Sequence, residues 1–420
     1  METLLIEHSG PLVGSVRVSG AKNAVLPMMA ACLLTDEPSV IEQVPLVTDL
    51  IMMLHILRRL GVTARLTADQ LTISPGGYTS TEAPYELVNR MRASICVLGP
   101  LLAKHGRAQV AMPGGCVIGP RPIDLHLKGL QALGASIAVE HGYLVATSQR
   151  LRGAKVHLSG AFGSSVLATA NVMMAATLAQ GTTIIEHAAC EPEVVDLANG
   201  LIAMGARIDG QGTSVIRVEG VERLRGLRYR IIPDRIEAGT WMIAAAMLGG
   251  DLTIEGARAE HLGAVIDKLS EAAVQIDKLN GSLRVRTTQP VQAVDVTTLP
   301  FPGFPTDLQA QMMALMAVSR GVSLLTEKVY PERFMHVAEF NRMGAQITRE
   351  GASAVIKGVE RLSGAPVVAS DLRASAALIL AGLKAEQQTE LDGVEHLDRG
   401  YQGLEDKFTR LGAHIQRVSQ

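Results

Sequence analysis

A short pattern recurs six times along the 420 residues and constrains the fold more than any other feature. An apolar, helix-like stretch ends in Leu or Met, continues as Gly-Ala-x-Ile, and leads into an alternating strand. The markers are Gly61, Gly134, Gly205, Ala273, Gly344 and Gly412, of which the fourth is a weaker copy. Their spacings of 73, 71, 68, 71 and 68 residues are too even for chance. Glycine here is typical of the residue after a helix, which takes a left-handed conformation.

Each repeat also holds a helix-like stretch that is apolar on most faces. These stretches are 26–34, 93–103, 171–179, 240–248, 308–318 and 374–383. Helices of this kind are buried, so we predict an α/β fold of βαβαβ-type units with helices inside and sheets around them. Repeats of about 70 residues are long for a solenoid. Two domains of three units each are favoured, since a domain usually has roughly 100–200 residues.

Charge and apolar content exclude several classes of protein. The chain carries 39 Lys and Arg against 41 Asp and Glu, which argues against a nucleic-acid binder. No apolar run approaches the roughly 18 residues needed to span a bilayer, and the first residues do not resemble a secretory signal. The four cysteines lack paired spacing. We expect a soluble, cytoplasmic protein with free thiols, no nucleic-acid partner and no membrane; the oligomeric state stays open.

Lys22 lies between a predicted strand at 14–18 and the first apolar helix. A cation beside free backbone N–H groups at a helix N-terminus suits a phosphate or carboxylate. A solvated loop lysine is the alternative.

Residues 112–124 are rich in Gly and Pro and predict a surface loop. This loop carries Cys116, with Arg121 five residues later. A nearby cation and exposure favour the thiolate, so Cys116 is a candidate nucleophile or proton donor. A small apolar filler is the alternative.

Arginines occur at similar places in different repeats, and facing domains would converge them on one anion. They are Arg92, Arg333, Arg373 and Arg399. Helix capping and salt bridges with Asp371 or Asp398 are the alternative. Asp307 falls in the first turn of an apolar helix, where it either complements the helix dipole or serves as a base.

Six segments together resemble the enolpyruvyltransferases, and most closely those that act on UDP-N-acetylglucosamine. They are 19–23, 113–125, 304–311, 333–337, 371–375 and 396–401. The resemblance covers nearly the whole chain. It implies two inside-out α/β domains, an inverse α/β barrel, with 22–232 as the N-terminal domain and 1–21 plus 233–420 as the C-terminal domain.

The resemblance also implies an activity. Phosphoenolpyruvate gives its enolpyruvyl group to the 3′-hydroxyl of UDP-N-acetylglucosamine and releases phosphate, with no cofactor and no metal. Cys116 would protonate C3 or add to C2, and fosfomycin would alkylate it. Asp307 would take the hydroxyl proton, and Lys22 and Arg399 would hold the phosphate with Arg121. The implied substrate-binding set is Lys22, Asn23, Arg92, Arg121, Pro122, Ile123, Asp124, Leu125, Asp307, Val329, Arg333, Asp371, Arg373 and Arg399.

Residues 160–169 depart from the family pattern. They are a few residues longer than the usual Ser-Val-Gly-Ala-Thr, with Leu167 in the glycine position and no lysine, and Pro120 replaces a small residue. Two alternatives follow: an enolpyruvyltransferase for a different nucleotide acceptor in a secondary pathway, or a non-catalytic paralogue.

Overall fold

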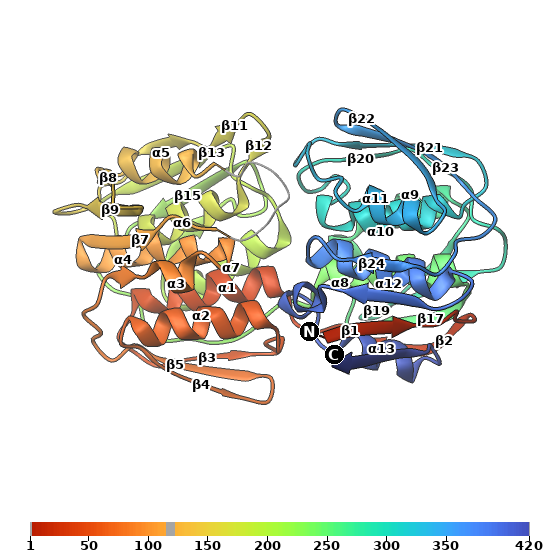
Figure 1. Cartoon of the computed structure of the whole chain (residues 1–420). Helices are drawn as coiled ribbons and strands as arrows, with labels where there is room; N and C mark the ends of the chain where they lie inside the picture. The colour runs from red at the N-terminus through yellow and green to blue at the C-terminus, as the bar shows by residue number, and fades with distance from the viewer. Residues whose placement is uncertain (1, 115–121, 420) are drawn as a thin grey trace. The chain divides into compact units, whose positions relative to one another are not determined.

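A computed structural model describes residues 2–114 and 122–419 (Figure 1). Two compact units can be distinguished. The first unit comprises residues 20–114 and 122–232, and the second unit comprises residues 2–19 and 233–419. Each unit has an apolar core of its own. Among the described residues, no helix is long and apolar enough to cross a membrane.

Three four-stranded sheets form the first unit, and each has two parallel strands followed by two antiparallel ones. The sheets, in strand order, are β16 (Arg228–Arg230), β3 (Ser39–Glu42), β5 (Gln70–Ser74) and β4 (Thr63–Thr67); β6 (Glu82–Ala83), β7 (Arg107–Ala111), β9 (Tyr143–Thr147) and β8 (Ser136–Glu140); and β10 (Lys155–His157), β13 (Thr182–Glu186), β15 (Val215–Glu219) and β14 (Arg207–Asp209). A hairpin adds β11 (Ser159–Gly160) and β12 (Gly163–Ser164).

The second unit repeats this strand pattern in three more sheets. They are β2 (Leu12–Arg17), β17 (Gly250–Glu255), β19 (Ser282–Thr287) and β18 (Gln275–Leu279); β20 (Val296–Thr298), β21 (Val322–Glu327), β23 (Ser353–Lys357) and β22 (Gln346–Glu350); and β24 (Pro366–Val368), β25 (Thr389–Asp392), β1 (Glu2–Ile6) and β26 (Ile415–Ser419). Strand β1 thus pairs with β25 and β26 near the C-terminus, as in Leu4 opposite Leu391, and β2 pairs with β17 in the middle of the chain.

The helices fall into two groups. The inner helices, which are almost wholly buried, are α1 (Lys22–Ala31), η2 (Arg92–Val97) continued by α4 (Leu98–His105), and α6 (Val166–Ala176) in the first unit, and α8 (Arg235–Leu248), α10 (Gln309–Ala317) and α12 (Leu372–Lys384) in the second. The flanking helices, which expose part of their surface, are α2 (Thr48–Arg59), α5 (Asp124–Ala132), α7 (Pro192–Ala203), α9 (Gly263–Glu271), α11 (Val337–Arg342) and α13 (Leu404–Arg410). Short turns complete the set: η1 (Cys32–Leu34), α3 (Tyr85–Val88), η3 (Ala259–His261), η4 (Thr306–Leu308) and η5 (Val394–Arg399).

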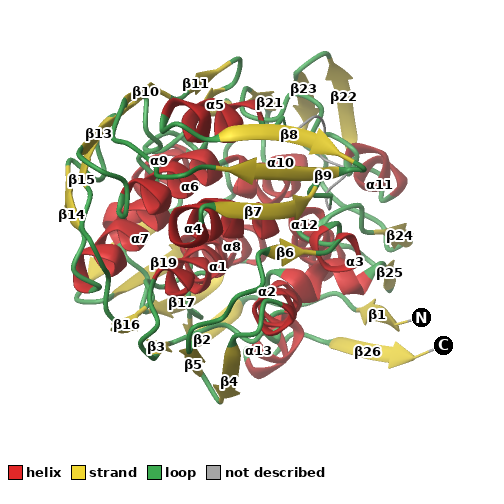
Figure 2. Cartoon of the chain, turned by 90° about the vertical axis from the view of Figure 1, so that its left-hand side faces the viewer, coloured by secondary structure: helices red, strands yellow, loops and turns green. Residues whose placement is uncertain are grey.

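The predicted arrangement of apolar helices under sheets is confirmed within each unit. In Figure 2, β7, β9 and β8 lie side by side, and α4 packs against β7 and β9. The predicted left-handed residues are confirmed as well, with φ between 88° and 103° at the five glycine markers and 69° at Ala273.

The three inner helices of the second unit run in the same direction. Gln311 in the first turn of α10 donates a hydrogen bond to Thr240 in the second turn of α8. Their last turns line a common cavity of about 760 Å³, to which Gly249, Ser319 and Lys384 contribute. Parallel helices of this kind place three N-termini, with their partial positive charge, at the same end of the unit.

Candidate functional site

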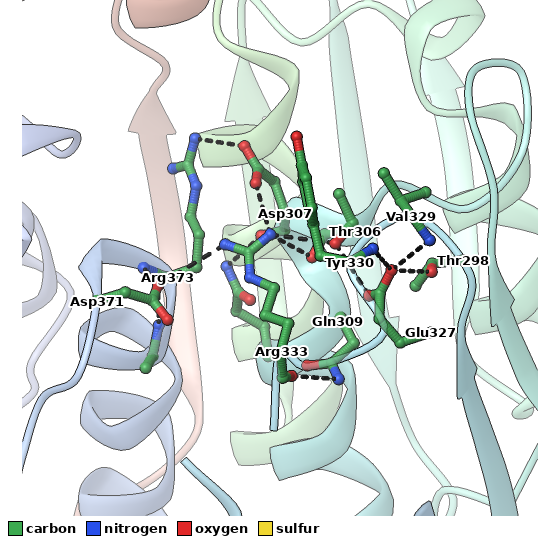
Figure 3. A network of polar contacts seen from close by, with 12 residues as sticks. Thr298, Thr306, Asp307, Gln309, Glu327, Val329, Tyr330, Arg333, Asp371 and Arg373 are labelled. Carbon is green, nitrogen blue, oxygen red and sulfur yellow. Dashed lines mark hydrogen bonds and ion pairs between the residues drawn. The ribbon is translucent and has the colours of Figure 1, made fainter. Parts of the chain in front are cut away.

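Asp307 lies at the N-terminal end of the inner helices of the second unit, in η4 just ahead of α10. Its carboxylate accepts hydrogen bonds from two arginines (Figure 3). Oδ1 is 2.9 Å from Nη1 of Arg333, and Oδ2 is 3.1 Å from Nη2 of Arg373. The side chains of the arginines are 3% and 2% exposed, whereas that of Asp307 is 27% exposed. Two buried cations therefore hold a carboxylate that solvent and substrates can reach.

Arg333 follows β21 and is tied to η4 by more than its ion pair. Its Nη1 also donates to the carbonyl and the hydroxyl oxygen of Thr306, each at 3.1 Å. Burial lowers the pKa of Arg333, but the carboxylates of Asp307 and Asp371 raise it by more, so the net shift is upward. The guanidinium is consequently a fixed positive charge.

Glu327 is a buried carboxylate at the end of β21 that sequence reasoning missed. Oε1 accepts from the hydroxyl of Thr298 at 2.6 Å and from the backbone amides of Val329 and Tyr330 at 2.8 and 2.9 Å. Oε2 accepts from the hydroxyl of Thr306 at 2.9 Å. These bonds fix the turn that carries Val329, a predicted substrate contact. The sequence signal that could have identified Glu327 is an acidic residue at an inward-facing position of a predicted strand.

Asp371 caps α12, which is the structural alternative considered for it. Its Oδ1 accepts from the backbone amides of Arg373 and Ala374 at 2.7 and 3.2 Å, and it lies 3.7 Å from Nη2 of Arg333. Burial raises the pKa of Asp371, but Arg333, His336 and the two backbone amides outweigh that effect and lower it. Asp371 thus has a capping role whatever else it does.

Arg373 is the most deeply buried cation of the group. Burial lowers its pKa, but the Asp307 carboxylate raises it by more, so the net shift is upward. Its Nε and Nη1 have no hydrogen-bond partner among the described residues. A buried guanidinium with unsatisfied N–H groups is suited to receive an anion. Arg399 closes η5 and is half-buried, while its neighbour Asp398 pairs with Arg417 at 2.8 Å.

Lys22 is the first residue of α1 in the first unit. It is 8% exposed, and its Nζ lies 2.7 Å from Oδ2 of the buried Asp49 on α2. The alternative of a solvated loop lysine is therefore wrong. The helix begins at Lys22, four residues before the predicted start, and Asn23 is half-buried in the same turn. Asp49 was missed because nothing in a single sequence pairs it with Lys22.

Arg92 opens η2, directly before the apolar stretch predicted at 93–103, and its Nη2 donates to the carbonyl oxygen of Pro122 at 3.1 Å. Asp124 is the exposed first residue of α5. The adjacent Ile123 and Leu125 are buried at 9% and 8% exposure. Arg92 therefore contacts the segment that leads into α5.

Three predicted features, Cys116, Pro120 and Arg121, lie outside the described residues. The divergent segment 160–169 lies within the described residues. It completes the hairpin of β11 and β12, after which the Ser165 hydroxyl accepts from the Ala168 amide at 3.3 Å and caps α6. The altered sequence thus forms a hairpin and a standard helix start.

Within the second unit, the structure brings together Asp307, Arg333, Asp371 and Arg373. Lys22 and Arg92 belong to the first unit, where each opens an inner helix. No group of three or more His, Cys, Asp or Glu side chains is placed to hold a metal ion in the part of the chain that the structure describes.

Comparison with known sequences gives full-length relatives. A family model described as EPSP synthase (3-phosphoshikimate 1-carboxyvinyltransferase) matches residues 6–408. UDP-N-acetylglucosamine 1-carboxyvinyltransferase 1 of Caldanaerobacter subterraneus subsp. tengcongensis is 52% identical over 413 residues, covering 98% of this chain and 99% of the relative. The UDP-N-acetylglucosamine 1-carboxyvinyltransferase of Myxococcus xanthus is 51% identical over 420 residues, covering 99% of each.

Solved structures with the same fold come from related enzymes. The enolpyruvyl transferase NikO from Streptomyces tendae has a TM-score of 0.90 at 25% identity and covers 100% of this chain and 99% of its own. An EPSP synthase from Acinetobacter baumannii, 18% identical with a TM-score of 0.76 and full coverage of both chains, shares the fold. On these grounds the chain belongs to the EPSP synthase family of enolpyruvyl (carboxyvinyl) transferases.

Proposed function

We propose that this protein transfers the enolpyruvyl group of phosphoenolpyruvate to the 3′-hydroxyl of UDP-N-acetylglucosamine, releasing phosphate in the first committed step of peptidoglycan synthesis. The acceptor is inferred from the shared name of relatives that are 50–52% identical over nearly the whole chain. Both substrates are small, soluble anions, and a cytoplasmic reaction is part of the proposal.

The observation that carries the chemistry is the Asp307 carboxylate held between Arg333 and Arg373. In this reaction the acceptor hydroxyl loses its proton while its oxygen bonds to C2 of phosphoenolpyruvate and C3 gains a proton. Loss of phosphate from C2 and of a proton from C3 restores the double bond. Asp307 is the proposed acceptor of the hydroxyl proton, because it is a partly exposed carboxylate whose direction is fixed by two bonds.

Anion recognition is assigned to cations at the starts of inner helices. Arg373 has a buried guanidinium whose Nε and Nη1 have no hydrogen-bond partner among the described residues, and Lys22 and Arg92 each begin an inner helix of the first unit. A positive side chain beside free backbone N–H groups suits phosphate and carboxylate oxygens. Arg121 and Arg399 are proposed to bind the phosphate with Lys22, and Asn23 and Asp124 to bind the nucleotide sugar.

Cys116 is proposed as the proton donor to C3, with addition to C2 as the alternative, and as the residue that fosfomycin alkylates. The intact protein incubated with fosfomycin and digested should carry one adduct, on the peptide that contains Cys116. Cys116→Ser should abolish the adduct. An adduct on Cys32, Cys96 or Cys190 in that variant would overturn the assignment.

The overall proposal is tested by phosphate release from phosphoenolpyruvate with purified protein. We expect release that depends on UDP-N-acetylglucosamine and yields its enolpyruvyl ether by mass spectrometry. The hairpin at 159–164 motivates a second arm with other nucleotides, such as UMP and UDP-glucose, as acceptors. Faster turnover of one of them would establish a different acceptor, and no release with any acceptor would favour the non-catalytic paralogue.

A further inference from the structure

A cluster of polar side chains lies inside the core of the second unit, below Asp307 and Arg373. It consists of Thr240 on α8, Gln311 on α10 and Tyr401 after η5, which are 0%, 0% and 3% exposed. Burying polar groups among apolar helices carries a free-energy cost that packing with apolar side chains avoids. Each of these side chains therefore needs hydrogen-bond partners inside the core.

The hydrogen bonds of this cluster have a definite direction. The hydroxyl of Thr240 gives its single proton to the carbonyl oxygen of Ile236, at 2.9 Å. It must therefore be the acceptor in its 3.0 Å contact with the hydroxyl of Tyr401. Burial raises the pKa of Tyr401, so the phenol keeps the proton that it donates. The phenol oxygen is then left to accept from Nε2 of Gln311 at 3.1 Å. Nε2 lies equally close to the Thr240 hydroxyl, so the two hydroxyl oxygens share one of its two N–H groups.

Gln311 and Tyr401 each contact one member of the Asp307–Arg373 ion pair. Nε2 of Gln311 donates to the backbone carbonyl oxygen of Asp307 at 3.1 Å, which fixes the residue that bears the carboxylate. The ring of Tyr401 lies 5.2 Å from the guanidinium carbon of Arg373, within cation–π distance. The hydrogen-bonded cluster of Thr240, Gln311 and Tyr401 thus contacts both Asp307 and Arg373, whose side chains are 3.1 Å apart.

We propose that Gln311 and Tyr401 are positioning residues that hold Asp307 and Arg373 in register for the transfer reaction. They act through those two residues and do not touch the substrates. This inference rests on the proposed function, which assigns proton transfer to Asp307 and anion binding to Arg373. It adds that the reactive geometry is set by a buried network that joins α8, α10 and the segment after η5, and that a small change in this network lowers turnover.

The test uses the full-length protein with Tyr401→Phe, Gln311→Met and the double variant. Tyr401→Phe keeps the ring under Arg373 and removes only the hydroxyl. A small displacement of a catalytic group lowers kcat by up to about 100-fold, so we expect kcat to fall by about 10- to 100-fold. KM should rise by a smaller factor, because Arg373 is one of several groups assigned to anion binding. Because either substitution breaks the same network, the double variant should lose little more than the worse single variant.

Tyr78→Phe is the matched control. The hydroxyl of Tyr78 donates to the carbonyl oxygen of Leu33 at 2.9 Å, and Nζ of Lys104 lies 5.6 Å from its ring. This buried tyrosine in the first unit therefore loses a comparable hydroxyl beside a comparable cation. We expect a similar loss of Tm with kcat unchanged. The inference would be wrong if Tyr401→Phe kept kcat within twofold of the parent and lost as much Tm as Tyr78→Phe. The network would then have only a structural role.

Crystal structures of the two single variants give a readout that does not depend on turnover. The inference expects the contact between Nη2 of Arg373 and Oδ2 of Asp307 to lengthen beyond hydrogen-bond distance. Retention of the 3.1 Å contact in both variants would overturn it. A parent protein without turnover on any acceptor would refute the proposed function alone, and the structures would still decide whether Gln311 and Tyr401 position the ion pair.

Discussion

Arg373 donates from Nη2 to Oδ2 of Asp307 at 3.1 Å, across 66 positions of sequence. The arginine side chain is 2% exposed and the aspartate side chain 27%. The difference in exposure indicates different roles for the two side chains. The buried guanidinium of Arg373 fixes the orientation of the Asp307 carboxylate, and that partly exposed carboxylate is accessible to a substrate. Both residues precede or open an inner helix, so the backbone of the second unit determines how they meet.

Asp307→Asn should abolish most of the activity. It should also lower stability, because it removes the charge that faces two buried arginines, so kcat is measured on protein shown to be folded by circular dichroism. The amide keeps the shape and can accept from an arginine, but it cannot take up the hydroxyl proton. General base catalysis contributes about 10²–10⁴-fold, and we expect kcat for phosphate release to fall within that range. Asp277→Asn, which removes an exposed carboxylate 2.6 Å from Arg286, is the control and should keep parental kcat. A loss below tenfold in Asp307→Asn would rule out Asp307 as the base.

The repeat predicted the fold better than it predicted the site. Positive φ at Gly61 and Gly412, for example, follows from local sterics that a single residue reveals. The pairing of Leu4 with Leu391 does not, because strand partners are chosen by packing over the whole chain. The exchange of N-terminal strands into the second unit was accordingly implied by resemblance and not by the repeat.

The site shows the same division. Charged residues in unusual motifs, such as Asp307 and Arg373, could be singled out from sequence. Their supports could not, because Glu327, Gln311 and Tyr401 act through hydrogen bonds to groups distant in sequence or to the backbone. Thr306 and Gln311 lie within the segment 304–311, which resembles the enolpyruvyltransferases, but no role could be assigned to either residue from the sequence. Only the three-dimensional arrangement distinguishes them from ordinary strand and helix residues.

Asp49→Asn should destabilise the protein strongly, because it leaves Lys22 with a weaker partner inside the first unit. Removing one member of a buried ion pair costs about 3–5 kcal/mol of the free energy of unfolding. Asp36 offers a matched control, since its carboxylate lies at the same 2.7 Å from Lys104 but is 64% exposed. Asp36→Asn should cost less than about 1 kcal/mol. Urea denaturation compares the two variants, and equal losses would contradict the burial argument.

Ala273→Gly should stabilise the protein by about 0.5–1 kcal/mol. Ala273 has a φ of 69°, which strains a residue that carries a Cβ atom by about 1–2 kcal/mol, and the greater freedom of glycine in the unfolded chain offsets part of the gain. Gly134→Ala is the reverse control, because its φ is 94° and a Cβ atom there would meet nothing within 4 Å. It should destabilise by a similar amount. A lower denaturation midpoint for Ala273→Gly would count against this conformational explanation.

His336 should make stability depend on pH. Burial, together with the nearby Arg333, lowers its pKa to about 4, although Asp371 acts in the opposite direction. The unfolded value is about 6.5. Between these values the unfolded chain binds one more proton than the folded chain, so stability falls as the pH drops, by about 1.4 kcal/mol per pH unit. Urea unfolding from pH 4.5 to 7 should show this slope reduced in His336→Met and unchanged in His414→Met, which replaces an exposed histidine. Equal slopes in the two variants would show that His336 is not the group responsible.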